Sequence, residues 1–434
     1  MSISPPTPFC VRRVAYRTAD SVRQCRKIYN TSCLCGRARD ALMPNSLVKD
    51  ALGTDYSVPT EKVVYTQDNA GAQPVSKDDE ELARIASALD VCIKIIGCGG
   101  GGTNTITRCH DSQIQGAQMC AVNTDAKHLL SVHSPRKILI GKRLTQGLGA
   151  GAIPEVGEEA AREADPDIRL FLQGGQIVFI TAGMGGGTGT GSAHYVARLA
   201  KEMKALTIGV VTLPFKAEGE LRMENAMSGL EKLRRICDTT IVIPNDKLLD
   251  LVPKLPIEAA FKVADEVLMQ TLKGLTEIVT RPGLVNLDYA DIMTVMNEGG
   301  VAFVGIGESS SEDKRIEEAV SEALNSPLLG EINLSESAGC LIRVTGGHDL
   351  TISEAQKAAE VVSSSISRNA RIIWGCSVED SLQGTVKVLL IVTGARSKYM
   401  LTKEDSVETL PEVGHSAHAA ASAQNFDEGI DVIR

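Results

Sequence analysis

From residue 91 onward, short apolar runs alternate with segments in which apolar residues recur at helical spacing. Six of the runs are rich in β-branched residues and apolar on both faces, which is typical of parallel strands covered by helices on both sides. They lie at residues 91–96, 119–123, 137–140, 177–182, 206–213 and 239–244. Helical stretches lie between them, including residues 154–163 and 217–236. The pattern predicts a doubly wound, mostly parallel α/β domain that binds a nucleotide, over residues 91–255.

A second unit follows a long helical stretch. That stretch, residues 256–278, belongs to a predicted central helix and link at 256–284. Beyond it, strands are predicted at 301–307, 339–347, 370–378 and 385–394, with helices at 313–324 and 353–366. We therefore expect a second, α+β domain over residues 285–395. Residues 396–434 are acidic and rich in Ala and Ser without a core pattern, which predicts a disordered tail.

The first ninety residues differ in composition from the rest. Residues 1–42 carry eight Lys and Arg against two acids. This basic, Ser-containing stretch has features of an organellar transit peptide. We favour a flexible leader, or sequence upstream of a natural start at Met43. Residues 43–90 are interpreted as an N-terminal extension that ends in a helix at 78–89.

Overall composition excludes several classes of protein. The 434 residues carry a net charge of −9, which argues against a general nucleic-acid binder. No apolar run approaches the roughly 18 residues of a membrane-spanning helix. The 11 Cys lack framework spacing, so we expect buried thiols in a reducing compartment rather than disulfides. No spacing of Cys and His is typical of a zinc site, and the metal ligands are unknown.

Two glycine-rich loops each follow a predicted strand and precede a helix. The first, GCGGGG at residues 97–102, fits GxGxxG, and Asp125 follows after the next strand. By itself this motif leaves open an NAD-dependent Rossmann enzyme or a structural turn. The second, TAGMGGGTGTGS at residues 181–192, exposes successive backbone N–H groups at a helix N-terminus, an arrangement that binds di- and triphosphates. A third glycine-rich stretch, GLGAGA, occupies residues 147–152.

Paired acids follow the long helix, in NLDYAD at residues 286–291. Asp288 and Asp291 are three residues apart and would share one face of a helical turn. They are the best candidates to orient and activate water. The alternative interpretation is an N-cap with acids that favour the helix dipole.

Together these motifs resemble the FtsZ family, the prokaryotic homologues of tubulin. The run GMGGGTGTGS is similar to the family signature, and the likeness extends over about residues 79–395. It includes the following blocks: IGCGGGG, AVNTDA, GLGAGA, LPFKAEGELR, VIPNDKLL, RPGLVNLDYADIMTVM and TGGHDLTISEA. The stretch MPNSLVKDAL from Met43 is also similar to the start of archaeal members.

The resemblance implies a site for GTP or GDP with Mg²⁺. Phosphate-binding residues are implied at Gly99, Gly100, Gly101, Gly102, Thr103, Asn104, Gly185, Gly186, Gly187, Thr188, Gly189 and Thr190, with Ala150 and Gly151 by the γ-phosphate. The family pattern further implies Asn123, Asp125, the ribose-side pair Glu218 and Arg222, Phe261 against the base, and Asp265 as acceptor from guanine. Asn286, Asp288 and Asp291 match the loop that completes catalysis on the nucleotide of the next subunit.

The resemblance also implies a cytoplasmic GTPase that polymerises head to tail and forms the division ring at mid-cell. Membrane-tethering adaptors are expected but unidentified, because the C-terminal DEGIDVIR departs from the peptide that binds adaptors in bacterial members. Neither nucleic acid nor a membrane span is expected. A cell-shape cytoskeleton of the same superfamily and a homologue that does not hydrolyse GTP remain alternatives.

Overall fold

The computed structural model describes residues 91–251, 257–280, 289–297, 300–311, 314–329 and 332–395. They all belong to one compact unit. The predicted leader, N-terminal extension and tail lie outside the described residues. Among the residues that are described, no helix combines the length and the apolar character that crossing a membrane requires.

Ten strands form one sheet. Their bounds are β1 Ile93–Cys98, β2 Ala117–Asn123, β3 Arg136–Leu139, β4 Ile177–Gly183, β5 Leu206–Leu213, β6 Thr239–Pro244, β7 Gly300–Ser309, β8 Gly339–Gly346, β9 Arg371–Val378 and β10 Val386–Thr393. The order across the sheet is β3-β2-β1-β4-β5-β6-β7-β10-β8-β9. Strands β1 to β7 run parallel, β10 is antiparallel to β7 and β8, and β9 is parallel to β8. The predicted fold class, mostly parallel α/β with an added α+β part, is confirmed.

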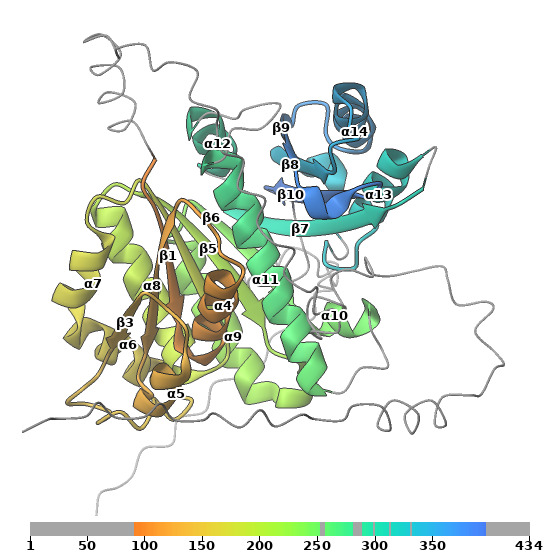
Figure 1. Cartoon of the computed structure of the whole chain (residues 1–434). Helices are drawn as coiled ribbons and strands as arrows, with labels where there is room; N and C mark the ends of the chain where they lie inside the picture. Colours follow the sequence, from red (N-terminus) through yellow and green to blue (C-terminus); the bar gives the residue numbers. More distant parts are fainter. Residues whose placement is uncertain are drawn as a thin grey trace, which may run out of the picture. The chain divides into compact units, whose positions relative to one another are not determined.

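Helices cover both faces of the sheet (Figure 1). One face packs on α4 Gly99–Asp111, α5 Ala126–Ser131, α10 Asn245–Leu251, α11 Ile257–Thr280 and α12 Tyr289–Met296. The other packs on α6 Pro154–Glu163, α7 Asp165–Leu172, α8 Gly187–Glu202, α9 Glu220–Arg234, α13 Arg315–Leu324 and α14 Ile352–Ser365. Three short 3-10 helices complete the described elements: η1 Lys216–Glu218, η2 Leu334–Glu336 and η3 Asp380–Leu382.

Strand β7 joins the two halves of the sheet. Its first residues pair with β6, from Thr239 opposite Gly300 to Ile241 opposite Ala302. Along its other edge, β7 pairs with β10 from Ala302 to Ser309. Helix α11 lies over this junction, and its apolar face shares one buried core with residues from β1 to β10. The two predicted units are therefore linked through backbone pairing as well as through the long helix.

One predicted helix is divided. The sequence predicts a continuous helix over residues 217–236, but η1 and α9 are separated by Gly219, whose φ is +102°. Such a φ is open to glycine and strained for other residues, so the chain turns here before α9 begins. The strands at 206–213 and 239–244 and the helix at 154–163 have the predicted bounds.

Candidate functional site

The first glycine loop leads from β1 directly into α4. Gly99 has a φ of +71°, and a methyl group on it would lie 2.6 Å from the amide nitrogen of Gly189. The first and second glycine loops are thus packed backbone to backbone. On the helix side, the Thr103 hydroxyl donates to the carbonyl oxygen of Gly99 (2.8 Å). The first turn of α4 has no bulky side chains, because its first four residues are glycines.

The second loop runs from β4 into α8. The Thr190 hydroxyl accepts a hydrogen bond from the Gly185 amide (2.9 Å), which closes the loop on itself. The neighbouring Thr188 hydroxyl lies 2.6 Å from that of Thr124, at the end of β2. In the described part of the chain, no side chain caps the N-terminus of α4 or α8. Both helices therefore present backbone donors and a positive dipole end beside the same loops.

The third glycine stretch closes against the second loop. Asp125 and Leu148 form an isolated bridge, and the Gly149 amide donates to the carbonyl oxygen of Thr124 (3.3 Å). A methyl group on Gly187 would lie 2.9 Å from the Cβ of Ala150. All three loops predicted from sequence therefore meet at the carboxyl ends of β1, β2 and β4.

Some glycines of these loops face open space. A methyl group on Gly100, Gly149, Gly151 or Gly186 would have no atom within 4 Å among the described residues. These positions border open space, whereas Gly99 and Gly187 hold the loops together. A concavity of backbone N–H groups at two helix N-termini binds anions, and several phosphates in a row fit it.

Asp125 and Asn123, two predicted binding residues near the first glycine loop, form hydrogen bonds within the protein. The side chain of Asp125 caps α5 by accepting from the His128 amide (3.0 Å). The Asn123 amide nitrogen lies 3.2 Å from Nδ1 of the same histidine, and the Thr103 hydroxyl lies 3.3 Å from that atom. His128 thus connects the end of β2 to the first glycine loop, a role that the sequence did not indicate.

The predicted base and ribose residues lie beyond β5. Phe261, at the start of α11, packs edge-on against Phe215 with ring centroids 5.0 Å apart. Glu218 and Arg222 form an ion pair with each other. Glu218 also accepts from the Phe215 amide (3.0 Å), so the two aromatic rings and the ion pair belong to one small cluster.

Asp265 has an unusual electrostatic environment. Burial raises the pKa of its carboxyl, Arg108 lowers it and the neighbouring Glu266 raises it, and the net effect raises this pKa to about 7. Arg108, on α4, lies 3.8 Å from Asp265 and 3.3 Å from Glu266. Arg108 could not be predicted from the sequence, because no local pattern indicates that an arginine in α4 faces acids on α11.

Asp291, one of the candidate catalytic acids, is far from the glycine loops. Asn286 and Asp288 lie outside the described residues, whereas Asp291 is exposed in the first turn of α12. The other end of α12 lies at the amino end of β6, where the Thr239 hydroxyl donates to the carbonyl oxygen of Met296 (2.5 Å). Phe261 lies instead at the carboxyl end of β5. Helix α11 spans the distance between them, about 36 Å for its 24 residues (Figure 1).

No metal centre is evident in the described parts of the chain, where no group of three His, Cys, Asp or Glu side chains could hold an ion. A divalent cation at this site would be bound mainly by the phosphate oxygens of the nucleotide, because Mg²⁺ prefers anionic oxygen ligands. The seven cysteines that the structure describes are free thiols, and six of them are buried.

Two family models match the chain. The tubulin/FtsZ family GTPase domain covers residues 92–253, and the FtsZ family C-terminal domain covers residues 300–396. Cell division protein FtsZ 1 of Archaeoglobus fulgidus is 49% identical over 359 residues, which span 83% of this chain and 95% of that protein. Cell division protein FtsZ 1 of Methanocaldococcus jannaschii is 52% identical over 328 residues, or 76% and 90% of the two chains.

Solved structures agree with these matches. An empty FtsZ dimer from M. jannaschii superposes with a TM-score of 0.70 at 52% identity, covering 74% of this chain and 92% of that one. CetZ2 from Haloferax volcanii superposes with a TM-score of 0.61 at 21% identity, covering 71% and 95%, which shows the shared fold alone. The predicted GTP-binding and GTP-hydrolysing activity is confirmed, and the NAD-dependent alternative is set aside. The chain belongs to the tubulin/FtsZ family of GTPases.

Proposed function

We propose that this GTPase polymerises head to tail and forms the division ring, with hydrolysis completed at each contact between subunits. The observation that carries the proposal is the placement of Asp291 and the glycine loops at opposite edges of one sheet. Because α11, about 36 Å long for its 24 residues, lies between the two edges, Asp291 of one chain would not reach a nucleotide in its own loops. A second subunit stacked on the first would bring its acids to that nucleotide.

In this mechanism the binding residues have the roles that the family resemblance implies. Backbone N–H groups of Gly99–Gly102 and Gly185–Gly189 would hold the phosphates, with Thr103, Asn104, Thr188 and Thr190 beside them and Ala150 and Gly151 near the γ-phosphate. Glu218 and Arg222 would line the ribose side, and Asn123 and Asp125, at the end of β2, would also contribute to nucleotide binding. Phe261 would lie against the base, and the Asp265 carboxylate would accept from guanine N1–H and the 2-amino group.

Catalysis would use the acids of the next subunit. Asp288 and Asp291, with Asn286, would orient the attacking water and accept its proton. Mg²⁺ would neutralise charge on the phosphate oxygens when bound. Stacking of this kind is heterologous and does not close, so it generates a filament.

The cellular role follows the relatives. The matched proteins of A. fulgidus and M. jannaschii are cell division proteins, and we propose the same role here, in the cytoplasm at the mid-cell ring. Adaptors that tether the filament to the membrane are part of this proposal. A role in cell shape is the second candidate, and localisation of a fluorescent fusion in dividing cells separates the two.

Complementation between two inactive variants tests the mechanism. Asp288→Ala should bind GTP and form filaments but lose most turnover. Asp265→Asn should lose GTP binding but retain the catalytic acids Asp288 and Asp291. Mixed in equal amounts, the two should hydrolyse GTP faster than the sum of the separate samples, because one supplies nucleotide and the other acids. Strict additivity would refute catalysis at the interface. So would a turnover rate per native molecule that stays constant down to very dilute protein.

A further inference from the structure

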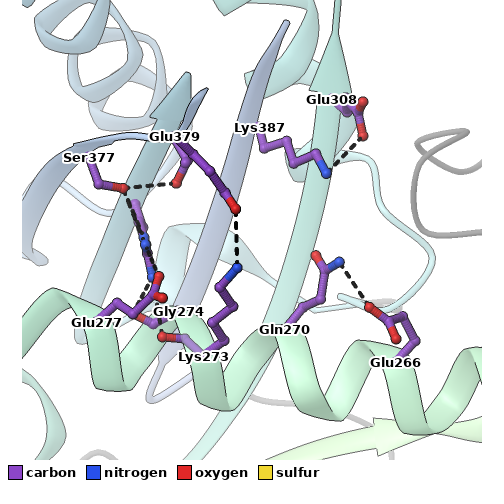
Figure 2. A network of polar contacts seen from close by, with 11 residues as sticks. Glu266, Gln270, Lys273, Gly274, Glu277, Glu308, Ser377, Glu379 and Lys387 are labelled. Carbon is purple, nitrogen blue, oxygen red and sulfur yellow. Dashed lines mark hydrogen bonds and ion pairs between the residues drawn. The ribbon is translucent and has the colours of Figure 1, made fainter. Parts of the chain in front are cut away.

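Arg343 is buried in β8 and reaches across to α11. Its side chain is 8% exposed. The guanidinium donates to the backbone carbonyl oxygens of Lys273 (3.2 Å) and Gly274 (2.9 Å) and to the carboxylate of Glu277 (2.5 Å). These acceptors lie on one face of the helix (Figure 2). A guanidinium has five donors in a fixed plane. Three acceptors along one helical turn therefore fix both the position of the helix along its axis and its rotation about that axis.

The other side of the guanidinium is held by the sheet. Nη2 and Nε of Arg343 lie 3.2 Å and 3.4 Å from the Ser377 hydroxyl on β9. Ser377 in turn lies 3.2 Å from the Thr345 hydroxyl. The side chain is therefore oriented from both sides. A buried polar group that is so fully paired specifies one arrangement of the elements around it.

A glycine allows this close approach of helix and sheet. A methyl group on Gly274 would overlap Cδ2 of Leu389 on β10. Glycine is unfavourable in a helix interior compared with alanine, yet at this position a larger residue would overlap the Leu389 side chain. The adjacent Lys273 pairs with Glu379 at 3.3 Å (Figure 2). Helix α11 and the C-terminal part of the sheet thus meet in a tight, polar joint around Arg343.

The same face of β8 also positions α12. Gly339, Leu341 and Arg343 alternate along the strand and so share one face. A methyl group on Gly339 would lie 3.0 Å from Cγ1 of Val295 in α12. Ile292 of α12 belongs to the same buried core as Leu341. One strand therefore fixes both the helix that begins at the nucleotide end and the helix that carries Asp291.

We propose that Arg343 is a positioning residue for GTP hydrolysis. By fixing α11 against β8, it sets the position of Asp291 relative to Asp265 and the glycine loops, and hence relative to the nucleotide of the neighbouring subunit. Displacements of about 1 Å in a catalytic group can cost on the order of a hundredfold in rate. The inference rests on the proposed function, in which Asp291 acts at the subunit contact.

The test must separate positioning from stability. Arg343→Met alone leaves the Glu277 carboxylate buried without its guanidinium, which destabilises the fold. The double variant Arg343→Met/Glu277→Leu removes both charges and keeps apolar volume. We expect it to melt close to the native protein and to bind GTP within about twofold, since the loops and Asp265 are untouched. Its turnover at saturating GTP and protein should fall by at least about tenfold.

A second arginine, which is partly buried, provides the control. Arg315 on α13 donates to the Glu354 carboxylate on α14 (2.7 Å) and pairs with Asp349. The double variant Arg315→Met/Glu354→Gln removes a comparable ion pair from the same half of the sheet, on its other face. We expect its turnover to stay within about twofold of native.

Two results would overturn the proposal. One is native turnover in the folded Arg343→Met/Glu277→Leu variant. The other is a loss of GTP affinity in step with turnover, which would indicate general damage. Asp291→Ala, assayed alongside, tests the underlying mechanism: if it hydrolyses GTP at the native rate, the proposed function fails. If Asp291→Ala loses turnover and the arginine variant does not, the role of Arg343 alone is refuted.

Discussion

Replacing Asp265 by asparagine should make the nucleotide-free protein more stable at alkaline pH. Burial raises the pKa of this carboxyl from 3.8 to about 7, despite Arg108 at 3.8 Å. The unfolded chain therefore releases the proton near pH 4, while the folded chain keeps it until about pH 7. Over that window the free energy of unfolding falls as pH rises, and above it this loss is complete.

The magnitude follows from the same shift. One pH unit of differential titration corresponds to about 1.4 kcal/mol. From pH 5.5 up to its pKa of about 7, the folded carboxyl stays protonated while the unfolded one is ionised. This interval of about 1.5 pH units corresponds to about 2 kcal/mol. Asparagine has the same shape and does not titrate. The stability of Asp265→Asn relative to native should therefore increase by about 2 kcal/mol from pH 5.5 to pH 8.

Urea denaturation of the nucleotide-free proteins at the two pH values measures this difference. A relative stability that changes by less than about 0.5 kcal/mol would refute the reasoning, because the carboxyl would then titrate alike in both states. GTP binding gives an independent readout. Guanine donors require the ionised carboxylate, so native affinity should fall below pH 7 by up to about tenfold per unit, and Asp265→Asn should bind weakly throughout.

Further predictions concern single positions. Gly191→Ala should lower stability by about 1–3 kcal/mol, because its methyl group would overlap the α6 backbone. Gly100→Ala, which faces open space, should not lower the melting temperature but should weaken GTP binding; equal destabilisation by both would contradict the packing. Thr188→Val should cost about 1 kcal/mol in urea denaturation through its lost 2.6 Å hydrogen bond. Thr351→Ala removes the capping box of α14 and should cost about 1 kcal/mol, with GTP turnover unchanged.

Much of the fold could be predicted because its strands are buried on both faces. Continuous apolar runs such as residues 206–213 and 239–244 have sharp ends, and the structure gives β5 and β6 the same bounds. The short helix α5 was not predicted, since six residues hold too few turns to show a period. The pairing of β6 with β7 also left no signal, because backbone pairing between distant strands has no side-chain signature.

The candidate site was predictable where glycine is dense and unpredictable where pairs form over long distances. The three glycine loops were recognised from their composition and their positions after strands. In contrast, Thr188 bonds to Thr124, 64 residues earlier, and Arg108 faces Asp265 from another helix. Such contacts depend on the order of strands in the sheet, which a local pattern does not contain.

In the proposed site, Asp265 would determine selectivity for the base, because the glycine loops would contact only the phosphates. A cradle of backbone N–H groups recognises a triphosphate but is blind to the base, because GTP and ATP carry the same phosphates. Phe261 can stack on either purine. In the proposed site, the Asp265 carboxylate would accept from N1–H and the 2-amino group of guanine, which adenine lacks. If its pKa is held near 7 by burial, guanine binding must also shift that equilibrium toward the ionised form, so selectivity for guanine should weaken as pH falls.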